Sequence, residues 1–533
     1  MAYWACYGFF MSIRTRMPNI PEEQITSEIA QLLSIIELQI KEIQFLKDEI
    51  ARLKGQKPKP NIKPSILQKQ IGAAKKKNRK KRARKSKKLE IHEVVSIAPD
   101  HIPAGSTFKG YQDYMVQDLI ISNWNICYRR QRWQTPDGGY IIGRLPDEIT
   151  GTHYGPTLTA FILYQYYGCH VTQPLIVEQL KELGIHISTG QISNIIIKNK
   201  ERFHTEKDQI LTTGLKISGH INVDDTGARH NGKNGYCTHI GNEFFAWFKS
   251  TESKSRINFL KLLRDQQSDY VINEAAIEYM KQQSFPRYQL AKLNNRIFTN
   301  ERKWKSFLFQ QGIRKKHHKR IATEGALVGS LLHHGWNRDL AIISDDAGQF
   351  NVLLHALCWV HAERAIEVLL GFNDHQRRLI ESVKNDIWHL YSRLKNYRRH
   401  PDKKTRVELE KRFDDIFGKK TGYALLDNVL KRIRQNRSEL LLVLDRPDIP
   451  LHNNLSERDI REYVKRRKIS GSTRSEDGRL CRDSFTSLKK TCRKLGISFW
   501  QYLIDRVANK MELAPLAAAM IEANSSPSFT LTY

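Results

Sequence analysis

Hydrophobic positions change their spacing several times along the chain, and each change predicts a different kind of element. From residue 29 to residue 53 the apolar positions recur every three or four residues, with one polar member, Gln39. This spacing predicts a helix within 25–55, which follows an N-terminal extension of residues 1–24. We interpret it as a short parallel coiled coil between two protomers rather than an amphipathic helix lying on the chain's own core. A polar residue on such a seam can select register or oligomer state.

A basic linker is predicted over residues 56–110, where three prolines end the coiled-coil pattern and a run of cations follows from Lys75 to Lys88. The run includes Lys80, Arg82 and Arg84. Such a block repels itself when alone. Bound to DNA, it would add salt-dependent affinity without reading bases. A solvated tail is the alternative, and the cations elsewhere in the chain favour the DNA contact.

The next two segments predict a small β unit at 111–150 and a helical region at 151–215. The first alternates apolar and polar residues and then turns at Pro136-Asp137-Gly138-Gly139, a hairpin signal. The second predicts two helices separated by a turn at Gly184, with Ser188 or Thr189 capping the second. This pair resembles a helix-turn-helix whose second helix, around 191–198, could enter a major groove. Its many isoleucines favour packing over DNA contact.

From residue 216 to residue 510 the pattern becomes α/β. HINVDD predicts a strand that ends in acids, and two further strands, a helix and a buried strand, LAIISDD, follow it. This order matches the front half of a ribonuclease-H-like fold, in which the ends of the first and fourth strands lie side by side. The predicted fold class is therefore α/β, with helical insertions near 266–334 and 365–445 and a C-terminal tail at 511–533.

Three acidic residues stand in this α/β region at points where they could act together. Asp224 and Asp345 follow the two apolar strands, and Glu457 lies in the first turn of a predicted helix that Asn453, Asn454 and Ser456 introduce. Carboxylates hold hard divalent ions, so the trio predicts a metal-dependent site that cuts phosphodiesters. We expect two Mg²⁺ ions about 3.5–4 Å apart, with Mn²⁺ as an alternative ion.

Cations gather around Glu457 in the same predicted helix and just after it. Arg461 lies one turn beyond Glu457 on the same face, and Lys465 lies a further turn on. We expect these side chains to meet DNA phosphates and the next four cations to clamp the backbone near the scissile phosphate. These four are Arg467, Lys468, Arg474 and Arg479.

Composition limits the class of partner and the compartment. The chain has 533 residues and a formal net charge of +31, which favours a polyanionic partner, nucleic acid above an anionic membrane. Seven cysteines occur without any CxxC pair, which is typical of a reducing compartment. No apolar run reaches the roughly 18 residues that span a bilayer. We therefore expect a cytoplasmic, nucleoid-associated protein with no membrane partner.

Four segments together resemble the transposases of the insertion sequence 66 family, which are bacterial DDE-type enzymes. The segments are VDDTGARHNGKNGYCTHIG, ISDDAGQFN, LCWVHAERAIE and the long stretch from IPLHNNLSERDIREYVKRRK onward. The resemblance runs in order from about Tyr111 to the C-terminus. It implies Asp224, Asp345 and Glu457 as the catalytic and metal-binding acids, with Asp225 and Asp346 as second-rank acids.

The same resemblance implies a substrate and partners. It implies hydrolysis at the element's ends, strand transfer of the freed 3′ ends into target DNA, a homodimer or higher oligomer, and small accessory proteins. Many relatives carry a Cys-rich segment ahead of the core, but the matching region here holds only Cys127, so we predict no zinc. Cys358, Trp359 and His361 form part of the family pattern, and we expect them to be structural.

Two other functions are compatible with these residues. One is a catalytically idle DNA-binding derivative, although all three acids are present. The other is a ribonuclease-H-like nuclease that cuts without strand transfer. A Mg²⁺-dependent nicking assay on element-end DNA separates the first from a transposase, and analysis of the reaction products separates the second.

Overall fold

A computed structural model describes residues 39, 91–146, 152–265 and 267–525. Apart from Gln39, the predicted coiled coil and the basic run with Lys80, Arg82 and Arg84 lie outside these residues. Within the described part of the chain, the helices are all too short or too polar to cross a bilayer.

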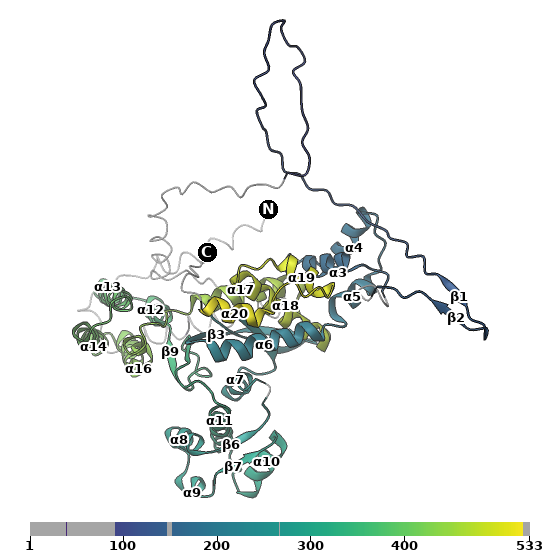
Figure 1. The fold of residues 1–533 in the computed structure, drawn as a ribbon. Coiled ribbons are helices and arrows are strands. Elements are labelled where there is room, and N and C mark those ends of the chain that lie inside the picture. The colour runs from purple at the N-terminus through teal and green to yellow at the C-terminus, as the bar shows by residue number, and fades with distance from the viewer. Residues whose placement is uncertain (1–38, 40–90, 147–151, 266, 526–533) are drawn as a thin grey trace, which may run out of the picture.

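A five-stranded mixed sheet forms the centre of the molecule (Figure 1), in the order β5-β4-β3-β8-β9. Three strands are antiparallel neighbours, and β8 and β9 then run parallel to β3. The strands are β3 (His220–His230), β4 (Lys233–Gly241), β5 (Ala246–Thr251), β8 (Ala341–Ser344) and β9 (His355–Leu357).

Strand β3 is longer than the sequence predicted. We expected it to end at the acids, but it continues through Asp224 and Asp225 to His230. The extension pairs with β4 as far as Lys233, across a tight turn at Asn231 and Gly232, both of which have positive φ. Asn-Gly is the preferred pair for such a hairpin turn, so this local signal outweighs the poor strand propensity of the acids.

Both faces of the sheet are buried, as its alternating residues show. In β8, Ile342 belongs to the larger hydrophobic core, whereas Ala341 and Ile343 belong to a second core. Helix α6 and the C-terminal helices pack on the first side, and the helices after β9 supply the second core (Figure 1). The helices on the first side are α6 (Glu201–Ile217), α18 (Glu476–Lys494), α19 (Phe499–Val507) and α20 (Leu516–Ser525).

Helix α18 also covers the open edge of the sheet. Side-chain oxygens of Asp483, Ser487 and Thr491, one turn apart, accept hydrogen bonds from the main-chain amides of β5 at 2.7, 2.9 and 3.2 Å. An edge strand with free amides invites pairing with another chain. Here the helix occupies those amides instead.

Two insertions interrupt the sheet. The first follows α7 (Arg256–Leu263) and contains a short strand pair and four helices, β6 (Tyr270–Ile272), α8 (Glu274–Gln282), α9 (Arg287–Leu290), β7 (Arg296–Phe298), α10 (Glu301–Gln310) and α11 (Lys316–His333). The second is helical and comprises α12 (Trp359–Glu367), α13 (Asp374–Tyr397), α14 (Lys403–Phe417), α15 (Ala424–Gln435), α16 (Arg437–Leu440) and η4 (Leu442–Leu444).

Ahead of the sheet, the structure contains less β structure than the alternation predicted. Among the described residues 91–146, the one strand pair is β1 (Arg132–Gln134) with β2 (Tyr140–Ile142), around the predicted turn, and residues 111–131 form no strand. Their apolar side chains are exposed, so an alternating pattern without a buried face is not enough to hold a strand. The helical region comprises α3 (Pro156–Leu163), the π-helical turn η3 (Tyr164–Gly168), α4 (Gln173–Glu182) and α5 (Thr189–Ile197), which Ser188 caps.

Candidate active site

Asp224 and Asp345 occupy equivalent places on neighbouring strands. In the parallel pairing of β3 with β8, Asn222 is opposite Ile343, and each acid lies two residues beyond its member of that pair. Strand β8 ends at Ser344, so Asp345 begins the loop that follows it. About 120 residues of sequence therefore separate two carboxylates that the sheet places side by side.

Glu457 reaches the same place because Asn453 ties the start of helix α17 (Asn454–Ser470) to β3. The Asn453 side chain donates a hydrogen bond to the carbonyl of Val223 at 2.8 Å and accepts one from Asn222 at 2.9 Å. It therefore does not cap its own helix. In the same turn, the Ser456 hydroxyl lies 2.6 Å from Nδ1 of His239 on β4. The first turn of α17, which carries Glu457, is thus fixed against the sheet.

The pKa of Asp224 is influenced by the other acids near it. Burial raises the pKa of Asp224 to about 7, and the charges of Asp345, Asp225 and Glu457 raise it as well. A hydrogen bond from the main-chain amide of Asp225 opposes this effect. Like charges that share a site disfavour further ionisation. Burial is thus the main cause of the raised pKa of Asp224, and the neighbouring acids add to it.

The two second-rank acids differ in their surroundings. Asp225 accepts hydrogen bonds from the Thr238 hydroxyl at 2.5 Å and from Nε2 of Gln349 at 3.1 Å. Asp346 is exposed and lies near the second insertion, 3.3 Å from Nδ2 of Asn436 and 3.7 Å from Nε of Arg432. Asp225 thus has its oxygens engaged by neutral donors, and Asp346 faces the helical insertion.

The segment Cys358–His361 contacts the start of α17, the helix that carries Glu457. The Cys358 thiol is buried and accepts a hydrogen bond from the main-chain amide of Asn453 at 3.2 Å, and the indole of Trp359 donates to the carbonyl of Leu440 at 2.9 Å. Nε2 of His361, however, lies 3.7 Å from Oε1 of Glu457. Burial lowers the pKa of His361, while Glu457 opposes this shift. His361 is therefore a neighbour of the acids as well as a packing residue.

The cations predicted to bind DNA fall into two groups. Arg461, Lys465, Lys468 and Arg474 are exposed. Arg467 instead donates hydrogen bonds to the Thr226 hydroxyl at 3.2 Å and to the Gly227 carbonyl, which fixes it against β3 just beyond the acids. Arg479 forms an ion pair with Glu476 on its own helix at 2.5 Å. The exposed group is free to meet a ligand, whereas Arg467 and Arg479 already have protein partners.

The residue types in the acid cluster fit a hard divalent ion. Three carboxylates from β3, β8 and α17 lie close enough for their charges to interact, and all three side chains are partly exposed. Among the described residues, no three His, Cys, Asp or Glu side chains are arranged so that they could hold a metal ion. Neighbouring carboxylates are nonetheless the ligands that a hard divalent cation prefers, and such a cation would offset their negative charge.

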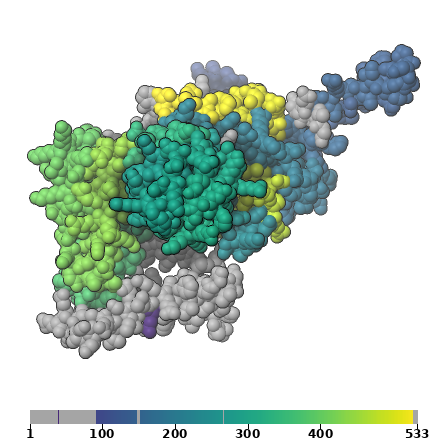
Figure 2. All heavy atoms as spheres, turned by 90° about the horizontal axis from the view of Figure 1, so that it is seen from below, coloured from purple at the N-terminus to yellow at the C-terminus, as the bar shows by residue number. Residues whose placement is uncertain are grey.

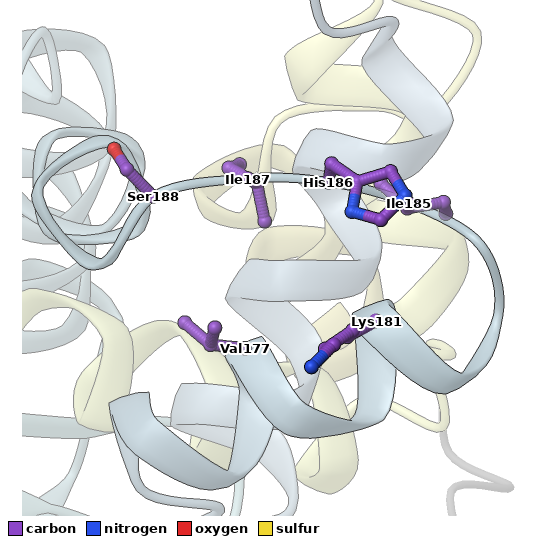
Figure 3. A pocket seen from close by; sticks show the side chains of 6 residues that line it. All are labelled: Val177, Lys181, Ile185, His186, Ile187 and Ser188. Atoms are coloured by element: carbon purple, nitrogen blue, oxygen red, sulfur yellow. The ribbon is translucent and has the colours of Figure 1, made fainter.

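The helix-turn-helix-like region has a hollow of its own, shown in Figure 3. It has a volume of about 340 Å³, lies between α4 and the start of α5, and contains none of the acids. Ile192 and Ile196 of α5 are fully buried, so the apolar face of this helix packs into the protein. The six lining residues are Val177, Lys181, Ile185, His186, Ile187 and Ser188.

Sequence patterns did not reveal three residues that position the cluster. Asn453 and Gln349 act through contacts with residues more than a hundred positions away. Arg256, the first residue of α7, donates to the carbonyl of Gly348 at 2.5 Å and to the Tyr279 hydroxyl at 3.1 Å. It thereby joins the first insertion to the loop after Asp345. Asn453 was expected only to introduce the helix.

Comparisons with known proteins identify the family of the chain. A family model described as "Transposase IS66 family" matches residues 288–479, which include Asp345, Cys358 and Glu457 but begin after Asp224. An uncharacterized protein, y4jO, of Sinorhizobium fredii (strain NBRC 101917 / NGR234) is 45% identical over 315 residues. The match covers 58% of this chain and 98% of that relative. The chain belongs to the IS66 family of transposases.

Proposed function

We propose that the protein is the DDE-type transposase of an insertion sequence. In this proposal it hydrolyses phosphodiesters at the element's ends and joins the freed 3′ ends to target DNA, with Asp224, Asp345 and Glu457 as the catalytic acids. The observation that carries the proposal is geometric: the register of β3 with β8 and the hydrogen bonds of Asn453 and Ser456 to the sheet bring together the three chain segments that carry these carboxylates.

The sheet supports a ribonuclease-H-like assignment of the core. Three antiparallel strands are followed, across β3, by two parallel strands, and the first and fourth strands in sequence order are neighbours. That adjacency is the feature that we predicted would unite Asp224 with Asp345. The second insertion lies between β9 and α17. A long helical segment therefore separates Glu457, in sequence, from the strands that carry or precede the other two acids.

Asp224, Asp345 and Glu457 would hold Mg²⁺ or Mn²⁺. A bound divalent ion would supply Lewis-acid stabilisation of the attacking and leaving oxygens of the phosphodiester. The chain's own cations would supply binding and orientation, since Arg461 and Lys465 follow Glu457 at helical spacing and are exposed. The hydroxyl nucleophile is water in the first step and the freed 3′ end in the second, so no serine or tyrosine has to form a covalent bond with DNA.

The test is cleavage of element-end DNA with Mg²⁺ by the full-length protein. Asp224→Asn, Asp345→Asn and Glu457→Gln should each retain DNA binding and lose cleavage, because each keeps its shape but loses its charge. Asp415→Asn, an exposed acid on α14, is the matched control and should cut normally. Normal cleavage by Glu457→Gln would remove this residue from the site. Cleavage without joined products would instead identify a nuclease.

A further inference from the structure

The first insertion carries a strong excess of positive charge. Between residues 287 and 320 the sequence contains eleven Lys and Arg residues and one acid, Glu301, which is a net charge of +10. Figure 2 shows this insertion, in teal, as a distinct block on one face of the molecule. It is separate in sequence from α17, which carries Glu457, Arg461, Lys465, Arg467 and Lys468.

The charge is displayed on the outside of two helices. Helix α10 buries Trp304, Phe307 and Leu308 and leaves Arg302 and Lys303 exposed. Four further exposed cations lie at the start of α11 and just before it, Arg314, Lys315, Lys316 and Lys319. We call these six residues the insertion patch.

The patch is not explained by pairing inside the protein. Glu301 is paired with Lys261 at 2.6 Å and with Lys305 at 2.8 Å, and Arg320 is paired with Glu324. Among the described residues, no ion pair joins any member of the insertion patch to a carboxylate. Arg314 instead lies over the ring of Phe309, 5.1 Å from its centroid, and this ring is 62% exposed.

The patch cations at the start of α11 destabilise that helix. Positive side chains in a first turn are repelled by the helix dipole, and α11 has neither an acid in that turn nor a side-chain cap. In contrast, α10 begins with Glu301 and a cap from Asn300. Cations held where they destabilise a helix are expected where an external anion compensates them.

The insertion is also connected to the candidate active site. Arg256 contacts Tyr279 and lies 3.8 Å from Glu324 of α11, while its other amino group binds the carbonyl of Gly348. Eight residues of helix, about 12 Å of rise, separate Lys316 from Glu324. A ligand on the patch would therefore lie on a helix that Arg256 links, through Glu324, to the loop after Asp345.

We infer that the insertion patch binds the phosphate backbone of duplex DNA, outside the acid cluster and without reading bases. This inference rests on the proposed function for its choice of polyanion. Clustered lysines and arginines on rigid helices are the means by which proteins contact backbone phosphates. The patch would thus give the protein a second DNA contact beside the one that presents the scissile phosphate.

The experiment measures DNA binding by the full-length protein without divalent ions, so that cleavage does not enter the result. The patch variant carries Arg314→Gln, Lys315→Gln, Lys316→Gln and Lys319→Gln. The control variant carries the same number of neutralised charges on the other insertion, Lys403→Gln, Lys404→Gln, Lys411→Gln and Lys420→Gln, all of which are exposed. Thermal melting confirms that both variants fold.

Fluorescence anisotropy is followed against salt for an element-end duplex and for an unrelated duplex of equal length. The slope of log affinity against log salt should fall by about three to four for the patch variant, close to one per lost phosphate contact, on both duplexes. The control should change it by less than one. An unchanged slope in the patch variant, or an equal fall in the control, overturns the inference.

Two further results also overturn it. A loss confined to the element-end duplex would mean that the patch reads bases. Retained DNA binding together with lost binding to phosphatidylserine vesicles would mean that the patch meets a membrane. If the DNA result holds while Asp224→Asn, Asp345→Asn and Glu457→Gln still cut DNA, the proposed catalytic acids fail and the patch stands.

Discussion

The side-chain amide of Asn453 donates a hydrogen bond to the carbonyl of Val223, the residue that precedes Asp224, at 2.8 Å. Asn453 itself precedes the helix that carries Glu457. One amide group therefore sets the distance between a strand acid and a helix acid. Because Asn453 is almost wholly buried, bulk water does not compete for this hydrogen bond.

Replacing Asn453 with Ala should misplace Glu457 relative to Asp224. We expect the cleavage rate to fall by 10-fold or more, because a small misplacement of a catalytic group can cost up to about 100-fold in rate. The unpaired Val223 carbonyl should also lower the free energy of unfolding by about 1–3 kcal/mol. Single-turnover cleavage and DNA affinity are measured together, and affinity should change little.

The matched control for this change is Asn396→Ala on the exposed face of α13. It removes the same side chain where no acid is near and should leave both quantities unchanged. Equal losses of cleavage and DNA affinity in Asn453→Ala would show a general loss of structure and contradict the positioning role.

Asp224 and Asp225 should differ in their importance for cleavage. Asp225 has one oxygen bound by the Thr238 hydroxyl and the other by the Gln349 amide, whereas Asp224 accepts its hydrogen bond on Oδ1, from the main-chain amide of Asp225. Asp224→Asn should therefore abolish cleavage, and Asp225→Asn should reduce it only partly. Cleavage rates at saturating Mg²⁺ check this order, and the reverse order would exchange the two roles.

Arg256 should affect the cleavage rate through its contact with the loop that follows Asp345. Replacement by Lys keeps the charge but cannot reach both the Gly348 carbonyl and the Tyr279 hydroxyl in the fixed geometry of a guanidinium. We expect slower cleavage with nearly unchanged DNA affinity. Lys261→Arg, on the same helix, is the control, and a cleavage rate in Arg256→Lys equal to that of the control would exclude the coupling.

Four of the five central strands, β3, β4, β5 and β8, could be predicted from the sequence because turn signals separate short strand-like segments. Strand β9 was not predicted, because its three residues are too few to show a period. The order of elements along the chain was enough to predict that Asp224 and Asp345 would be close. The predicted end of β3 was wrong because the acidic residues were given more weight than the Asn231-Gly232 turn, although this turn signal is present in the sequence.

The parts that escaped prediction depend on contacts between remote segments. Asn453 and Arg256 have ordinary local contexts, and their roles arise only when β3, α17 and the loop after β8 meet. The alternation over residues 111–131 predicted strands, but no apolar surface covers these residues in the structure. The spacing of hydrophobic residues alone does not show whether another segment packs against the apolar face.

Asp459 should make folding sensitive to acid. It is buried with Lys494 at 2.6 Å and Lys490 at 2.9 Å, and these cations, with His239, hold its pKa well below the usual value although burial opposes the shift. A carboxyl with a lowered pKa in the folded state stabilises the fold above its unfolded pKa, near 3.8, and loses this contribution as pH falls below that value.

Asp459→Asn should therefore lower the free energy of unfolding by about 3–5 kcal/mol at pH 7, because it leaves the buried Lys494 without its partner. Urea unfolding of both proteins at pH 7, 5 and 3.5 provides the measurement. The difference between them should be equal at pH 7 and 5 and smaller at pH 3.5. A difference that grows as the pH falls would contradict the lowered pKa of Asp459. The control is Asp477→Asn, which removes an exposed carboxyl paired with Lys198 and should change the free energy of unfolding only slightly at every pH.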